Sequence, residues 1–216
     1  MIDVLPPKRR QAPVQKRSEE TVERILLGAE MLICQVPLDF VTAGRIAKAA
    51  GISIGSLYRF FGDKQAVFDA LARRHLKQLR ERLESRVLRP LEHSQEGKDA
   101  GFNQFEFLEN VIDTYVSYLE ENEPFRALSL GPRGSVGAMA RHVSPIAGLP
   151  GVLKSVLMER MRVPHNLELE LRMQVFGEAG ERLIAFAFEQ KTSEARHRVV
   201  QEMKDMLTGY LFVRKQ

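Results

Sequence analysis

Residues 43–64 read AGRIAKAAGISIGSLYRFFGDK, which predicts a short helix, a tight turn and a second short helix. Ile46, Ala47 and Ala50 recur at helical spacing and give the first helix an apolar face. Gly51 follows where the chain must turn, because glycine adopts a positive φ at little cost. The segment therefore predicts two helices that cross at close range.

The second helix is expected to pack through one side and to expose the other. Ser53 is a favourable N-cap, and Leu57, Phe60 and Phe61 supply an inner face. Small, aromatic and basic side chains suited to a DNA groove remain on the outer side, namely Ile54, Gly55, Ser56, Tyr58 and Arg59. The pattern is typical of a helix-turn-helix motif; the alternative is a helical hairpin with no role in nucleic-acid binding.

Residues 42–68 resemble the DNA-binding domain of the tetracycline-repressor-like (TetR) family of bacterial regulators. The residues that carry the resemblance are Thr42, Ile46, Ala47, Ala50, Gly51, Ile52, Ser53, Gly55, Ser56, Leu57, Tyr58, Phe61 and Lys64. It extends back through Thr21, Ile25 and Ala29, which match the first helix of the family. The resemblance implies an all-helical, homodimeric repressor that binds double-stranded DNA and whose C-terminal domain binds a small effector.

The resemblance also implies roles for individual residues. The residues expected to contact phosphates are Thr42, Ser56, Tyr58 and Lys64, and those expected nearest the bases are Ile54, Gly55 and Arg59. The chain departs from the family at Gly44 and Arg45, because Arg45 cannot complete a capping box with Thr42. The full set of candidate DNA-binding residues is Thr42, Gly44, Arg45, Ser53, Ile54, Gly55, Ser56, Tyr58, Arg59 and Lys64.

Composition limits the class of protein. The chain has 216 residues, of which 44% are hydrophobic, enough for one or two packed domains. Cys34 is the single cysteine, so no internal disulfide is possible, and we expect a buried thiol. Neither a secretion signal nor a membrane-length apolar run is visible, which fits a cytoplasmic protein, and the resemblance to bacterial DNA-binding regulators implies association with the nucleoid.

The distribution of charge and the helical periodicity predict that the chain has three parts. Residues 1–90 contain 17 Lys and Arg against 10 Asp and Glu, whereas the remainder contains 15 against 18, so the basic half holds the motif. We expect a basic, disordered arm over residues 1–16, a helix-turn-helix DNA-binding domain over 17–64, and a helical effector-binding and dimerisation domain over 65–216. The arm is either a solvated tail or a segment that follows the DNA backbone.

Helical periodicity continues through most of the chain, so the predicted fold class is all-α. Helices are expected from Ser18 to about residue 34 and over residues 63–89, 102–121, 124–130, 152–161, 166–190 and 193–213. Residues 131–151 contain five glycines and three prolines, which favours a flap beside a pocket.

Apolar residues of the C-terminal half supply two further candidate sites. The candidate effector pocket, for a small and largely apolar molecule, consists of Phe102, Phe105, Leu108, Tyr115, Phe125, Met139, Met158, Phe176 and Phe186. The candidate dimer interface consists of Phe176, Ala179, Gly180, Leu183, Val199, Met203, Met206 and Tyr210. Wide apolar stripes on the last two helices fit either the core of one monomer or half of an intermolecular four-helix bundle, and the DNA motif favours the bundle.

Other functions receive little support. The five histidines are scattered without the spacing of metal ligands, and no catalytic constellation is visible, so we expect neither a metal, a cofactor nor an enzyme activity. The alternatives are a structural DNA-binding protein without effector control and a small helical enzyme.

Overall fold

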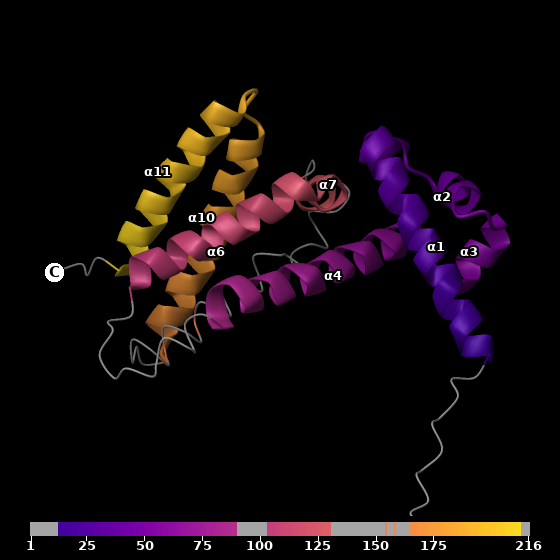
Figure 1. The fold of residues 1–216 in the computed structure, drawn as a ribbon, viewed down its shortest axis with the longest axis horizontal. Coiled ribbons are helices and arrows are strands. Elements are labelled where there is room, and N and C mark those ends of the chain that lie inside the picture. Colours follow the sequence, from indigo (N-terminus) through magenta and orange to yellow (C-terminus); the bar gives the residue numbers. More distant parts are fainter. Residues whose placement is uncertain (1–12, 90–102, 131–153, 155–157, 159–164, 213–216) are drawn as a thin grey trace, which may run out of the picture. The chain divides into compact units, whose positions relative to one another are not determined.

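The computed structural model describes residues 13–89, 103–130, 154, 158 and 165–212. Every regular element of these residues is a helix, which confirms the predicted all-α class. The chain divides into two compact units, Met1–Leu71 and Ala72–Gln216, and the boundary falls within one long helix, α4. Figure 1 shows the helices of each unit.

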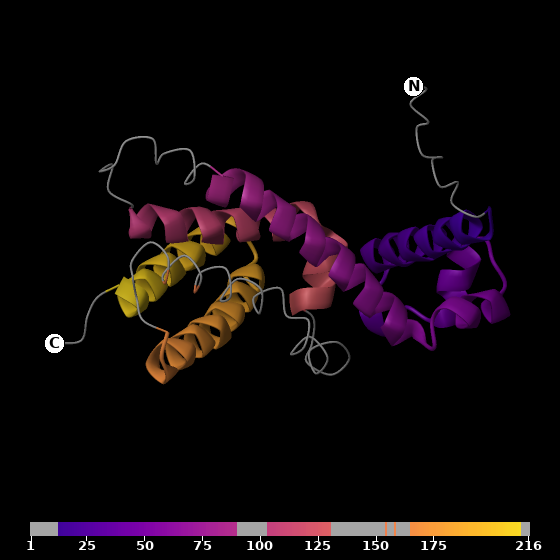
Figure 2. The same ribbon diagram turned by 90° about the horizontal axis from the view of Figure 1, so that it is seen from below.

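The first unit contains three helices and the start of a fourth. They are α1 (Pro13–Gln35), α2 (Ala43–Ala49), α3 (Ile54–Phe60) and the first turns of α4 (Lys64–Leu83), with a 3-10 turn at Leu38–Phe40. α1 packs on α2, and α2 packs on α3 (Figures 1 and 2). The core of this unit is formed by buried side chains that include Ile25, Ala29, Ile46, Leu57 and Val67.

Two predictions for α1 are wrong. The helix begins at Pro13 rather than at Ser18, because proline fits the first turn of a helix, where its missing N–H has no partner to lose. Residues 13–16 of the predicted arm are therefore helical, and residues 1–12 lie outside the described residues. Cys34, expected to be buried, is exposed near the end of α1.

Gly28 determines how closely α1 approaches α2. A Cβ atom on Gly28 would lie 3.0 Å from the backbone nitrogen of Ala50 and 3.3 Å from the carbonyl carbon of Ala49. Only glycine permits this separation without a shift of one helix. Gly180 on α10 is under no such constraint, because a Cβ there would meet Leu207 Cδ1 at an ordinary 3.7 Å.

The second unit is a bundle around one hydrophobic core. Its elements are the rest of α4, a π-helical turn at Glu84–Leu88, α6 (Gln104–Glu121), α7 (Glu123–Leu130), α10 (Leu167–Phe188) and α11 (Ser193–Phe212). α10 and α11 form an antiparallel hairpin, and α6 packs on α11 and on the π-helical turn (Figures 1 and 2). α6 thus holds the centre of this unit.

Most predicted boundaries in the second unit are confirmed within a few residues. Asn166 caps α10 by accepting a hydrogen bond from the N–H of Leu169 at 2.8 Å. The cap of α11 is Thr192, whose hydroxyl accepts from the N–H of Ala195, so the helix begins at Ser193, where the predicted helix begins. The expected flap over 131–151 lies outside the described residues, as does the expected helix over 152–161 apart from residues 154 and 158.

A polar cluster joins α4 to α6 and α7 inside the second unit. The hydroxyl of Tyr118 donates to Gln78 Oε1 at 2.9 Å, so the Nδ1–H of His75 must donate to that hydroxyl, also at 2.9 Å. The ring of His75 stacks on Phe125 at 5.2 Å, and the guanidinium of Arg82 lies 5.0 Å above the ring of Tyr118. These directional contacts fix the rotation of α4 against its neighbours.

Candidate nucleic-acid interface

Local capping shapes the two helices of the motif. Ser53 Oγ accepts a hydrogen bond from the N–H of Ser56 at 3.1 Å, which confirms the predicted cap of α3. Thr42 Oγ1 accepts from the N–H of Arg45 at 3.3 Å, so Thr42 caps α2 even without an acidic partner. Gly51 has a φ of 65°, as predicted for the turn between the helices. The helix-turn-helix geometry thus follows from short-range chemistry.

The outer face of α3 is exposed. Leu57 is fully buried against the unit's core, whereas Ile54 and Tyr58, one helical turn apart, are 49% and 50% exposed. Gly55 and Arg59 are also exposed, and the remaining candidate on this helix, Ser56, is half-buried. Phe60 and Phe61 are half-buried on the inner side, in agreement with the prediction.

Two basic candidates also hold the backbone before α2. Arg45 Nη1 donates to the carbonyl of Phe40 at 2.9 Å, and Lys64 Nζ donates to the carbonyl of Val41 at 3.1 Å. Lys64 is the first residue of α4, one residue after the predicted start, so its bond ties α4 to the entry of α2. Each cation retains further N–H donors, since a guanidinium has five and an ammonium three.

Glycines leave open space on this surface. A Cβ on Gly55 would meet no heavy atom within 4 Å, and one on Gly44 would meet only Ile54 Cδ1, at 3.9 Å. Neither glycine is required by packing inside the described fold. All ten candidate DNA-binding residues lie in or beside the motif. Seven are on α2 or α3, Thr42 and Ser53 are the N-caps of these helices, and Lys64 begins α4.

The described members of the candidate effector pocket fall into two groups. Four are buried in the core of the second unit: Leu108, Tyr115, Phe125 and Phe176. Three are exposed: Phe105, Met158 and Phe186. Phe102 and Met139 lie outside the described residues. Burial raises the pKa of the Tyr115 hydroxyl above its ordinary value, and the negative charge of Glu181 adds to this effect.

The candidate dimer interface is divided in the same way. Phe176, Gly180 and Met203 are buried within the protomer, where they pack between α10, α11 and their neighbours. Ala179, Leu183 and Val199 are half-buried at the edge of that core. Met206 and Tyr210 are exposed on α11.

Three further exposed apolar residues, all on α10, were not among the predicted interface residues. Leu167, Leu171 and Val175 recur at i, i+4 and i+8 on α10, and all three are exposed. The spacing itself was the available signal, because it marks one helix face. The name apolar patch is used below for Leu167, Leu171, Val175, Met206 and Tyr210.

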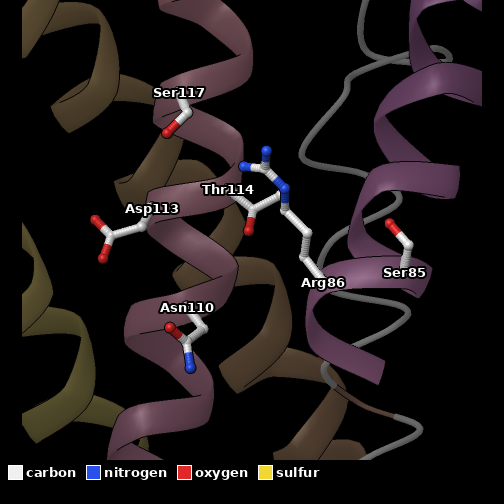
Figure 3. A pocket seen from close by; sticks show the side chains of 6 residues that line it. All are labelled: Ser85, Arg86, Asn110, Asp113, Thr114 and Ser117. Atoms are coloured by element: carbon white, nitrogen blue, oxygen red, sulfur yellow. The ribbon is translucent and has the colours of Figure 1, made fainter. Parts of the chain in front are cut away.

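A polar cavity between the π-helical turn and α6 was also missed (Figure 3). Its side chains are Ser85, Arg86, Asn110, Asp113, Thr114 and Ser117. The four on α6 have the i, i+3, i+4, i+7 spacing of one helix face, which the sequence does show. What the sequence does not show is that Arg86 lies opposite them.

Searches for other sites among the described residues were negative. No group of three or more histidine, cysteine or acidic side chains there is arranged to hold a metal ion. Nor does any helix of the described ranges have the length and apolar character needed to cross a bilayer.

The fold and the exposed face of α3 define a helix-turn-helix DNA-binding protein with a second helical unit. Residues 25–71 match the profile described as bacterial regulatory proteins of the tetR family. Residues 106–211 match the profile described as the tetracycline repressor-like C-terminal domain. The chain therefore belongs to the TetR family of transcriptional regulators, as the resemblance implied.

Similar proteins agree with this assignment at the level of the fold. A TetR-family transcriptional regulator from Streptomyces coelicolor superposes with a TM-score of 0.61 at 24% identity, over 88% of this chain and 97% of that one. FadR of Thermus thermophilus, a TetR-family repressor solved with lauroyl-CoA, gives 0.63 at 21% identity, over 90% and 97%. The nucleoid occlusion factor SlmA of Haemophilus ducreyi is 39% identical over 61 residues, which are 28% of this chain and 29% of that relative.

Proposed function

We propose that this regulator is a dimeric repressor that inserts α3 into the major groove of a palindromic operator and is released by a small-molecule effector. The observation that carries the proposal is the exposed face of α3. Ile54 and Tyr58 are about half exposed there, on a helix whose opposite side is fixed by the buried Leu57. A rigid helix with large exposed side chains suits insertion into a groove.

The proposal assigns a contact to each candidate residue. Tyr58 and Ser56 donate hydroxyl hydrogen bonds to phosphates, and Arg59 reaches base edges or phosphates with its exposed guanidinium. Gly55 lets the helix lie close to the duplex, because no side chain stands there. Thr42 and the remaining donors of Arg45 and Lys64 lie at the ends of neighbouring helices, where they suit backbone phosphates.

The apolar patch on α10 and α11 is the proposed dimer interface. Large apolar side chains exposed in a group are typical of protein–protein contact surfaces. Pairing two such hairpins around a two-fold axis would form a four-helix bundle and match a palindromic site, with recognition helices about 34–36 Å apart. Binding to chromosomal DNA would place the dimer at the nucleoid, in the cytoplasm.

Effector release requires that the ligand bind the DNA-free conformation better than the DNA-bound one. The lauroyl-CoA complex of the Thermus thermophilus repressor supports a ligand-responsive second unit in this fold. The apolar class of the effector stays a prediction from the sequence, because the buried candidate residues fill the core and the other described candidates are exposed.

Selection of bound sites from random DNA by the purified protein tests the proposal. A palindrome with half-sites one helical turn apart supports it, whereas binding without any sequence preference favours the structural DNA-binding alternative. The selected site then serves in mobility-shift assays at controlled salt concentration.

Tyr58→Ala is the decisive variant, and Met31→Ala on α1 is its matched control, since Met31 is 47% exposed in the same unit. Loss of a direct contact should weaken operator binding about tenfold or more in Tyr58→Ala only. Equal affinity of the two variants would remove α3 from the interface. Lys64→Ala is a poorer test, because it also breaks the bond to the Val41 carbonyl.

A further inference from the structure

The polar cavity of the second unit has the dimensions of a ligand site. It is a solvent-open hollow of about 450 Å³ between the π-helical turn Glu84–Leu88 and α6. Small-molecule sites commonly occupy about 300–1,000 Å³. Figure 3 shows Ser85 and Arg86 on one side and four α6 side chains on the other. The cavity lies entirely within one compact unit.

The α6 side of the cavity is part of the polar face of an amphipathic helix, which also carries the exposed Glu106, Glu109 and Glu120. Asn110, Asp113, Thr114 and Ser117 share one face, while Leu108 and Tyr115 point into the core. A solvated helix face would leave all four exposed, but Thr114 is only 6% exposed and Ser117 is half-buried. Thr114 therefore lies deepest in the hollow, whereas Ser85, Arg86, Asn110 and Asp113 are exposed at its rim.

The opposite side depends on the π-helical turn. Ser85 and Arg86 both belong to it, and Arg86 extends toward α6 beside Thr114 (Figure 3). Such turns are rare and occur frequently at functional sites. Ser85 Oγ donates its hydrogen to the carbonyl of Arg82 at 3.0 Å, so toward the cavity this hydroxyl can only accept.

Charge in the cavity favours an anion. Asp113 Oδ1 pairs with Lys204 Nζ at 2.6 Å, and the Lys204 side chain is 9% exposed, so the carboxylate is neutralised from α11. No ion pair joins Arg86 to a carboxylate of the residues that the structure describes. Among the described residues the guanidinium of Arg86 thus has no carboxylate partner, and guanidinium binds carboxylate through two parallel hydrogen bonds.

We propose that this cavity binds a small hydroxylated monocarboxylate. Its carboxylate lies on the Arg86 guanidinium, and its hydroxyl groups exchange hydrogen bonds with Asn110, Thr114 and Ser117. Ser85 accepts one more hydrogen bond from the ligand. Only the regulatory consequence, a change in operator affinity when the acid binds, rests on the proposed function; the binding site itself does not.

Calorimetric titration of the full chain without DNA tests the site. The hydroxy acids tested are glycolate, glycerate and gluconate. Two compounds serve as controls: sorbitol, the neutral counterpart of gluconate, and hexanoate, an acid without hydroxyl groups. Arg86→Gln removes the cavity's cation, and Arg80→Gln is the matched control, since Arg80 is exposed on α4 and pairs with Glu84. Both substitutions change the net charge equally.

Saturable binding of at least one hydroxy acid is expected, equal in the parent chain and in Arg80→Gln and at least tenfold weaker in Arg86→Gln. Sorbitol and hexanoate should bind at least tenfold more weakly, and Ser117→Ala should lose several-fold affinity for the acid. Three results would overturn the proposal. They are no binding of any of the three hydroxy acids up to about 10 mM, equal affinity of the acid for Arg86→Gln and for the parent chain, or equal affinity of the parent chain for sorbitol and for the acid.

Mobility-shift assays separate this proposal from the proposed function. If the acids fail to bind while Arg86→Gln still retains the selected operator without ligand, the cavity assignment is overturned and the DNA-binding proposal stands. Acid binding without any effect on operator affinity would support the site and overturn its regulatory role.

Discussion

The contact of Gly28 with the end of α2 makes one substitution especially informative. In Gly28→Ala the new Cβ would lie 3.0 Å from the Ala50 nitrogen and 3.3 Å from the Ala49 carbonyl carbon. Both are backbone atoms, so no side-chain rotation can relieve the contact. Either α2 moves away from α1, or α1 bends.

The expected free-energy change has two opposing parts. Extra atoms in a packed interior cost about 1–3 kcal/mol. Alanine in place of glycine within a helix returns about 1 kcal/mol. Gly28→Ala should therefore destabilise the first unit by as much as about 2 kcal/mol. Gly180→Ala meets only Leu207 Cδ1, at 3.7 Å, and should stabilise the second unit by about 1 kcal/mol.

Urea denaturation at fixed protein concentration, combined with hydrogen exchange, measures both effects. Exchange in Gly28→Ala should accelerate in α1, α2 and α3 and stay unchanged in α10 and α11. Operator affinity should fall as well, because α3 is positioned by α2. A Gly28→Ala protein more stable than the parent would refute the reasoning about close helix approach.

Three further predictions concern caps and buried charge. Ser53→Ala removes the cap of α3 and should cost about 1 kcal/mol in urea denaturation, with weaker operator binding; an unchanged midpoint would contradict this. Asp113→Asn should lower the free energy of unfolding more than Lys204→Met does. The first substitution leaves the nearly buried Lys204 ammonium without its counter-charge, whereas the second replaces that charge with an apolar chain. The reverse order in urea denaturation would contradict the Asp113–Lys204 ion pair. Burial raises the pKa of Tyr115 in the folded state, so its contribution to the free energy of unfolding is present below pH 10 and is lost as the pH rises further. Tyr115→Phe should therefore reduce the alkaline loss of stability by about 1.4 kcal/mol per pH unit. An unchanged dependence of stability on alkaline pH would contradict the burial of the Tyr115 hydroxyl.

The helix-turn-helix was predictable because its determinants are local. Gly51 sets the turn through its own φ, and Ser53 caps α3 by a bond to the third residue beyond it. The start of α1 was misplaced because a proline-containing basic segment suggests disorder, while Pro13 is equally suited to a first helical turn. Boundaries of this kind depend on which neighbours pack, not on sequence alone.

The two missed surfaces depend on tertiary contacts. α10 has apolar residues on more than one side, so periodicity alone could not separate Phe176, which packs inside the protomer, from Leu171, which is exposed. The polar cavity requires Arg86 to lie opposite Asn110 and Ser117, which are more than twenty residues away in the chain. Such a juxtaposition leaves no trace in local spacing.

Gly44 and Gly55 have a consequence for how this regulator can diverge. Added atoms at either position enter solvent rather than the interior, so substitutions there carry little folding cost. Selection for a new target sequence can therefore explore these sites while the hydrophobic scaffold beneath them stays fixed. Duplicated copies of the gene would acquire distinct binding preferences through substitutions that alter the DNA-facing surface and leave the fold stable.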